Sequence, residues 1–369
     1  MTTLRNSIGE RIPKTLETAS TLLEETAPAS KTQRQIEKTV KPPFISRLAM
    51  LYYCISFGGF TWIWIGVTRL CLRFPLVVVP LVFLYLLYIT GPGSQASCDG
   101  SWTPTWRTWG MWKVCKSYFA RAELIKTADL DGSKSYIFVH HPHGILAFSA
   151  WLAFGTEALG FSKLFPGIDN RVVTLNINFH APLLREYLLA HGVCSVAKSS
   201  LINLLNLGKS VTLVVGGGSE SLLSSPGKYE LVLNRRKGFV KVALETGASL
   251  VPVIGFGETE TYRTVNQFAH DNIIRKIQRK IEKRLGFTLP IVLGRGVLFS
   301  FGLLPYPVPL HIVTGPPVHV PKFEGDVTSA VFRAQVDKYH GIYKKALFDL
   351  FESNKEKYAK DAADMVIIE

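Results

Sequence analysis

The chain has 369 residues, of which 47% are hydrophobic and 19% are charged, and its mean hydropathy is +0.18. This composition excludes an intrinsically disordered protein and is less apolar than that of a polytopic transporter, so it indicates a water-soluble body with a small membrane segment. Lys and Arg number 42 against 28 Asp and Glu, a net charge of +14. Such an excess favours an anionic partner: phospholipid headgroups, a phosphorylated cofactor or nucleic acid.

The N-terminal quarter predicts an arm followed by a membrane segment. Residues 1–47 are polar and contain four prolines, so we expect a mostly mobile arm with at most a short helix near Leu16–Thr26. Residues 48–68 and 74–90 carry no charge and are separated by Arg69 and Arg73. As helices they would extend ~31 Å and ~25 Å. Three arrangements stay open: a hairpin crossing the bilayer twice, a re-entrant pair in one leaflet, and a buried pair of core helices.

The rest of the chain predicts an α/β domain. Residues 91–134 contain four tryptophans among basic residues and are expected to form an interfacial linker. Residues 135–355 alternate short apolar runs with helical patterns, which predicts a largely parallel sheet with flanking helices. Residues 356–369 are expected to be a tail. The expected strands are 136–139, 172–175, 193–196, 211–215, 250–254, 291–293 and 311–313, and the expected helices are 145–154, 182–191, 201–207, 236–246, 262–285 and 329–354.

The first candidate site is the string His140-His141-Pro142-His143-Gly144, which directly follows an expected strand. A strand-to-helix turn lies at the carboxyl edge of a parallel sheet, where α/β folds place ligands. The free N–H groups that open the following helix can bind an anion, and they favour a neutral imidazole that can accept a proton. Metal binding and a purely structural role are alternatives. The five cysteines are scattered without C-x-x-C spacing, so we expect neither a structural zinc nor a disulfide framework, as in a body facing the cytosol.

Two further segments carry chemistry. Gly216-Gly217-Gly218-Ser219-Glu220-Ser221 follows another expected strand, but it matches neither a nucleophile elbow nor a dinucleotide fingerprint, and no helix is expected to begin there. It predicts a glycine turn that presents Glu220, with a plain turn as the alternative.

Basic residues form two clusters beyond this turn. One is Arg235, Arg236 and Lys237 at the start of an expected helix, where cations oppose the helix dipole and would suit the phosphates of coenzyme A. The other is an amphipathic basic helix over residues 273–285, which would lie on an anionic bilayer rather than bind nucleic acid. A solvated basic face is the alternative for the first cluster.

Six segments in order resemble the acyl-CoA:diacylglycerol acyltransferase type 2 family, which includes monoacylglycerol acyltransferases and wax synthases. They are YIFVHHPHGIL (136–146), FPGID (165–169), NFHAPLLREYL (178–188), VVGGGSESLLSSPGK (214–228), NRRKGFVKVALETGASLVPVIGFGE (234–258) and GRGVLFSFGLLPYP (294–307). The resemblance covers residues 45–355. It implies an enzyme of the endoplasmic reticulum or lipid droplet that transfers a fatty acyl group from acyl-CoA to diacylglycerol. The basic residues that flank the uncharged segments favour a catalytic domain that faces the cytosol. Acyl-CoA is then a co-substrate, and no bound cofactor or metal is expected.

The same resemblance implies the roles of individual residues. His141 and His143 belong to the catalytic HPHG motif, Glu220 to the acidic motif, and Phe83, Leu84 and Leu86 to a neutral-lipid motif.

The expected mechanism is direct acyl transfer without an acyl-enzyme. His143 acts as general base, Gly144 lies at the oxyanion, and Glu220 or Glu258 orients the imidazole. Ser219 is the serine whose labelling by a fluorophosphonate would contradict this mechanism. The expected partners are acyl-CoA, diacylglycerol and membrane lipids. Monoacylglycerol or fatty-alcohol acceptors, a non-catalytic lipid-transfer protein and a homo-oligomer stay open.

Overall fold

A seven-stranded sheet forms the centre of the molecule, in the order β1-β10-β7-β2-β5-β3-β4. The five strands from β7 to β4 are parallel, whereas β10 runs antiparallel to β7 and parallel to β1. The computed structural model describes residues 30–58, 60–264, 280, 291–299 and 301–368. The strands are β1 (Ala122–Lys126), β2 (Tyr136–His141), β3 (Asn170–Thr174), β4 (Cys194–Ser195), β5 (Ser210–Val214), β7 (Ser249–Phe256) and β10 (Leu310–Thr314). The predicted α/β fold with a largely parallel sheet is confirmed.

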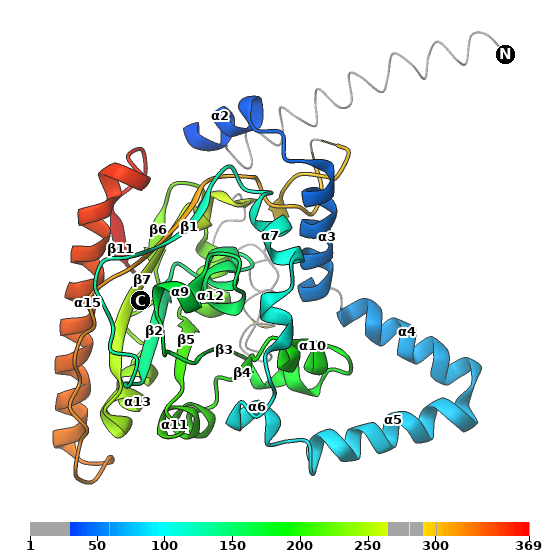
Figure 1. Ribbon diagram of the computed structural model, residues 1–369, viewed down its shortest axis with the longest axis horizontal. Helices are drawn as coiled ribbons and strands as arrows, with labels where there is room; N and C mark the ends of the chain where they lie inside the picture. Colours follow the sequence, from blue (N-terminus) through cyan, green and yellow to red (C-terminus); the bar gives the residue numbers. More distant parts are fainter. Residues whose placement is uncertain (1–29, 59, 265–279, 281–290, 300, 369) are drawn as a thin grey trace.

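Helices cover both faces of this sheet, and every residue of β2 and β7 is buried between them. One face packs against α11 (Lys198–Asn206), α13 (Gly238–Thr246) and α15 (Ala330–Tyr358). The other packs against α3 (Phe44–Gly58), α7 (Met111–Lys116), α8 (Phe148–Ala150) with the π-helical turn Trp151–Gly155, and α9 (Phe161–Leu164). Figure 1 shows α15 and α13 on one side of the strands and α7 and α3 on the other.

The structure corrects several predicted boundaries. β1 lies inside the predicted linker, and the predicted tail contains β11 (Met365–Ile367), which pairs with β6 (Tyr229–Leu231). Sequence periodicity misses these short strands because three to five residues carry little pattern. Of the predicted arm, residues 31–39 form α2, whose N-cap Ser30 accepts from the N–H of Gln33. The predicted helix at Leu16–Thr26 lies outside the described residues, as does nearly all of the predicted basic helix.

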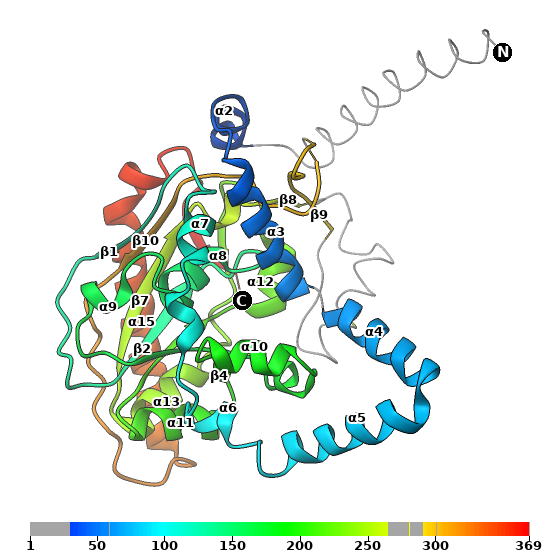
Figure 2. The ribbon, with the colours of Figure 1, turned by 45° about the vertical axis from the view of Figure 1, so that its right-hand side comes forward.

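The predicted membrane segment 48–68 is divided between two helices. α3 buries Ala49, Met50, Tyr53 and Cys54 against the body, so this part belongs to the core. The second helix, α4 (Phe60–Arg73), leads into α5 (Pro75–Thr90), and both views show this pair projecting from the body (Figures 1 and 2). None of the helices that the structure describes has the length and hydropathy needed to cross a bilayer.

α5 exposes apolar side chains around most of its circumference. Leu76 is 92% exposed, and the predicted lipid-motif residues Phe83, Leu84 and Leu86 are also exposed. Tyr85 contacts the body, where its hydroxyl donates to Glu186 of α10 (Leu184–Ala190) at 2.7 Å. The helix is therefore attached to the body through Tyr85, while most of its apolar side chains are exposed.

Candidate active site

Three neighbouring parallel strands end at the same edge of the sheet and deliver the candidate residues. His140 of β2 pairs with Val214 of β5, and His141 pairs with Ile254 of β7. The turn after β2 carries His143, the turn after β5 carries Glu220, and the turn after β7 carries Glu258. The pairing of β5 with β2 and of β2 with β7 therefore brings together residues that are far apart in the sequence.

The ring of His143 is held by its Nδ1 atom. This atom lies 3.1 Å from the carbonyl oxygen of Gly144 and 2.9 Å from Oγ of Ser221. A carbonyl only accepts, so Nδ1 carries the hydrogen. The Ser221 hydroxyl donates its own hydrogen to the carbonyl of Gly217, at 3.2 Å, and can accept from Nδ1. Nε2 then holds the lone pair, and it makes no hydrogen bond with any residue that the structure describes.

The electrostatics of His143 agree with its expected role as a base. Its side chain is partly buried, and desolvation lowers the pKa of the imidazole, while the hydrogen bond with Gly144 acts in the opposite direction. A lowered pKa keeps the ring neutral at pH 7, which is the form that accepts a proton.

Ser221 is the residue that sequence reasoning missed. It lies in α12 (Gly217–Leu223), a helix that begins inside the glycine string and that the sequence analysis did not expect. The missed signal was that the run from Ser219 to Leu223 contains no helix breaker, so the glycines precede a helix rather than a plain loop. This helix buries Ser221, with 3% of its surface exposed, directly beside the imidazole of His143.

Glu220 packs under the glycine turn. A Cβ atom on Gly216 would lie 1.5 Å from Oε2 of Glu220, and Gly216 has a φ of +102°, so both the space and the backbone angle require glycine. Burial raises the pKa of Glu220 well above its usual value, although the N–H groups of His143 and Val232 and the charge of Arg236 oppose the shift. Among the described residues, neither carboxyl oxygen of Glu220 forms a hydrogen bond with the ring of His143.

Glu258 supports the histidine turn from the neighbouring strand. Its carboxylate is completely buried and accepts from the N–H of Phe148 at 3.2 Å, and from the N–H and hydroxyl of Ser149 at 2.8 and 2.6 Å. A Cβ atom on Gly144 would lie 2.5 Å from Oε1 of Glu258, so this glycine lets the turn lie directly on the carboxylate. Burial raises the pKa of Glu258 to about 7, against the effect of these hydrogen bonds.

This arrangement corrects the predicted anion site. The helix was expected to begin at Ile145 with free N–H groups, but it begins at Phe148, and Glu258 takes up its first N–H groups. An oxyanion contact at Gly144 stays a prediction. Neither Glu220 nor Glu258 hydrogen-bonds the ring of His143, because Gly144 and Ser221 occupy its Nδ1 side.

The other two histidines point to opposite faces of the sheet, as strand alternation requires. His140 lies 3.1 Å from the Ser149 hydroxyl, and the His141 ring lies 3.1 Å from the hydroxyl of Tyr343 on α15. Burial lowers the pKa of both to about 3. His141 is 1% exposed and its ring contacts Tyr343 rather than the ring of His143, so a catalytic role for His141 stays a prediction. The alternative reading of the three histidines as one metal site conflicts with these directions.

The predicted coenzyme A residues are divided by the structure. Arg236 donates to the carbonyl of Gly216 at 3.3 Å, which places it at the glycine turn beside Glu220. Lys237 instead forms an ion pair with Asp337 of α15 at 2.6 Å. Arg235 is exposed beside them at the start of α13. Arg236 is therefore placed against the turn that carries Glu220.

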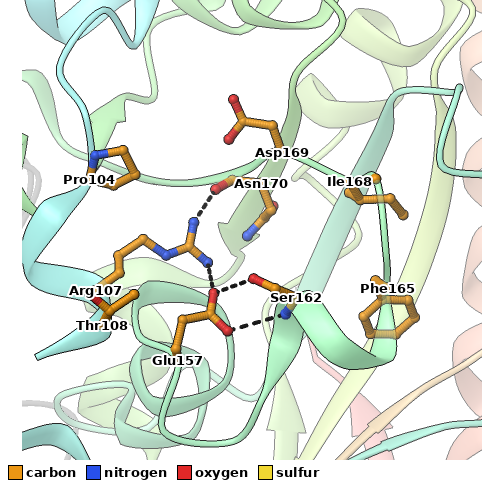
Figure 3. A pocket seen from close by; sticks show the side chains of 10 residues that line it. Pro104, Arg107, Thr108, Glu157, Ser162, Phe165, Ile168, Asp169 and Asn170 are labelled. Atoms are coloured by element: carbon orange, nitrogen blue, oxygen red, sulfur yellow. Dashed lines mark hydrogen bonds and ion pairs between the residues drawn. The ribbon is translucent and has the colours of Figure 1, made fainter. Parts of the chain in front are cut away.

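A cavity of about 430 Å³ lies at the opposite edge of the sheet, where β3 begins. Figure 3 shows Arg107 of this cavity, which donates to the main chain of Asn170 at 2.7 Å and pairs with Glu157 at 3.3 Å. The FPGID segment also lines it. Arg107 and Glu157 neutralise each other there, and the cavity lies at the edge of the sheet away from the histidine turn.

Comparisons with known proteins show the family to which this chain belongs. A family profile described as "Diacylglycerol acyltransferase" matches residues 69–368. The chain belongs to the diacylglycerol acyltransferase family. It is 42% identical to diacylglycerol O-acyltransferase 2A of Umbelopsis ramanniana, over 86% of this chain and 88% of that protein. Diacylglycerol O-acyltransferase 2 of Danio rerio is 41% identical, over 79% and 80% of the two chains.

A third relative and one solved structure are also similar to this chain. The 2-acylglycerol O-acyltransferase 1 of Bos taurus is 38% identical over 84% of this chain and 91% of its own length. The solved 1-acyl-sn-glycerophosphate acyltransferase of Thermotoga maritima aligns with 77% of this chain and 97% of its own. Its identity of 10% and TM-score of 0.38 are too low to inform the fold or the function.

Proposed function

We propose that this chain transfers a fatty acyl group from acyl-CoA to diacylglycerol and thereby forms triacylglycerol. The observation that carries the proposal is the free Nε2 of His143, held at the carboxyl edge of the sheet by its Nδ1 contacts with Gly144 and Ser221. Membership of the family and similarity to two diacylglycerol O-acyltransferases support diacylglycerol as the acceptor.

The proposed step is a direct displacement. Nε2 of His143 takes the hydroxyl proton of diacylglycerol as that oxygen bonds to the thioester carbonyl carbon. The carbon–sulfur bond then breaks, and the proton passes to the thiolate of coenzyme A. General-base catalysis of this kind contributes about 10²–10⁴-fold. Ser221 and Glu258 act as positioning residues, because one contacts the imidazole and the other holds the main chain that follows it.

Arg235 and Arg236 are the proposed contacts for the phosphates of coenzyme A, and the contact of Arg236 with Gly216 supports this assignment. The α4–α5 pair is the proposed membrane anchor, in the re-entrant arrangement, because its exposed apolar side chains need a lipid solvent. We place the enzyme on the endoplasmic reticulum or lipid droplet with the α/β domain in the cytosol.

The test is the activity of full-length His143→Ala with labelled acyl-CoA and diacylglycerol, at matched protein levels. Activity below one hundredth of the wild-type value is expected, and more than a tenth would refute the base. His180→Ala is the matched control, since that exposed histidine lies away from the turn and its Nδ1 bonds to the carbonyl of Asn176. Because a relative is a 2-acylglycerol O-acyltransferase, monoacylglycerol is the second candidate acceptor. An acceptor panel that measures coenzyme A release decides between them, and no release with any acceptor would indicate a lipid-transfer protein.

A further inference from the structure

A short apolar loop projects from the body beside α3. Leu298, Phe299, Phe301 and Leu303 are 73%, 67%, 61% and 70% exposed, and the rings of Phe299 and Phe301 stack with centroids 6.0 Å apart. Both views place this segment next to the N-terminal end of α3 (Figures 1 and 2). Four large apolar side chains at one tip mark an interaction surface rather than ordinary surface variation.

Main-chain hydrogen bonds close the base of the loop. Arg295 and Leu304 exchange two main-chain hydrogen bonds of 2.6 and 2.7 Å, and Gly302 donates to Gly294 at 3.0 Å. A Cβ atom on Gly296 would lie 2.5 Å from the carbonyl oxygen of Phe301, so the tight crossing requires glycine. These contacts close the base of the loop, and the apolar side chains beyond it are exposed.

Two arginines meet beneath this tip. Arg47 and Arg295 line a cleft of about 170 Å³ together with Pro42, Tyr118, Leu298 and Phe299, and none of the lining residues is acidic. Arg47 donates to the carbonyls of Pro42 and Val297, and Arg295 donates to that of Val40. These contacts fix both guanidinium groups and leave further N–H groups on each. Within the described parts of the chain, neither arginine forms an ion pair.

The surroundings of the cleft favour a membrane lipid as its occupant. Arg47 lies in the first turn of α3, where a cation opposes the helix dipole and an anion would offset it. Along α3 the exposed residues Phe44, Ile45, Leu48 and Ile55 recur at helical spacing and continue the apolar surface from the loop toward α4. A phosphate beside two arginines, with acyl chains against the loop tip, matches both the charge and the apolar surface.

We propose that the cleft between α3 and the loop Arg295–Leu304 binds the phosphate of a bilayer phospholipid, while the apolar tip enters the same leaflet. The loop would be a second membrane contact, far in sequence from α4 and α5. The chain after the loop is hydrogen-bonded to the segment that follows Glu258. The N–H of Tyr306 donates to the carbonyl of Thr261, three residues after Glu258, at 2.7 Å. Binding there would fix the distance of the active site from the lipid surface.

The test measures retention of dioleoyl phosphatidate by the full-length protein in neutral detergent, using native mass spectrometry. Arg47→Gln with Arg295→Gln should lower retention at least tenfold. Arg121→Gln with Arg333→Gln, which changes two exposed arginines elsewhere, should leave it unchanged. Equal retention by the two double variants would overturn the proposal. Thermal unfolding of each variant confirms that it is folded.

Competition and cross-linking identify the source of the phosphate. Coenzyme A or inorganic phosphate that displaces the lipid at equal concentration would overturn the assignment to a phospholipid. In vesicles, a benzophenone side chain at position 299 should cross-link to lipid and one at position 348 on α15 should not. Cross-linking of position 299 to protein instead would also overturn it. Position 84 on α5 reports the proposed anchor separately, so a failure of that anchor is distinguishable from a failure of the loop.

Discussion

Replacing Ser221 by Ala separates two roles that a serine beside a histidine can have. As a positioning residue, Ser221 accepts from Nδ1 of His143 at 2.9 Å, and the carbonyl of Gly144 at 3.1 Å remains as a second acceptor after the replacement. The loss is then one neutral hydrogen bond, worth about 0.5–1.5 kcal/mol. At 1.36 kcal/mol for each tenfold change, kcat should fall about 2- to 13-fold.

A nucleophilic Ser221 would give a different result. An acyl-enzyme cannot form without the hydroxyl, so kcat would fall by more than about a thousandfold. The assay is steady-state transfer of labelled oleoyl-CoA to diacylglycerol by the full-length protein, with kcat and KM measured separately. Ser162→Ala is the matched control, because its hydroxyl donates to Glu157 in the cavity at the opposite edge. A fall in kcat of more than a hundredfold in Ser221→Ala would refute direct transfer. Labelling of Ser221 in the wild-type protein by a fluorophosphonate would also refute it.

Three other predictions concern the protonation of His143, the hydrogen bonds of Glu258 and the residues that contact acyl-CoA. The lowered pKa of His143 should keep the base deprotonated in mild acid, so the acidic half-point of the kcat profile should lie below pH 6.5, and a half-point above 6.5 would contradict this. Glu258→Ala removes the acceptor of three buried hydrogen bonds, so unfolding in urea should show a loss on the order of 3 kcal/mol and kcat should fall at least tenfold. Glu258→Gln keeps one acceptor oxygen and should lose less, and equal losses would exclude the acceptor role. Arg235→Gln with Arg236→Gln should raise the KM for acyl-CoA more than the KM for diacylglycerol, whereas Lys237→Gln, which breaks only the ion pair with Asp337, should change neither. A larger rise in the KM for diacylglycerol than in the KM for acyl-CoA would show that the two arginines do not bind acyl-CoA.

Much of the fold could be read from local patterns. The buried strand β2, the helix α15 with its Ser329 cap, and the alternation between them follow from hydrophobic periodicity and capping. The ordered family motifs indicated the family, and the roles proposed for His143 and Glu220 come from that resemblance. The short strands β1 and β11 were missed because each is stabilised by pairing with a distant strand rather than by its own pattern.

The sequence alone determined the family and the α/β class, and it predicted the histidine that is proposed as the base, because these depend on residue types at short spacing. The tertiary structure decided which groups surround that histidine. Ser221, rather than a glutamate, contacts the imidazole ring of His143. Glu258 accepts from an N–H group of the helix that was expected to bind an anion, and His141 faces α15. The physical reason is that strand register and the alternation of side chains across a sheet set these contacts, and both are fixed only when distant strands pair.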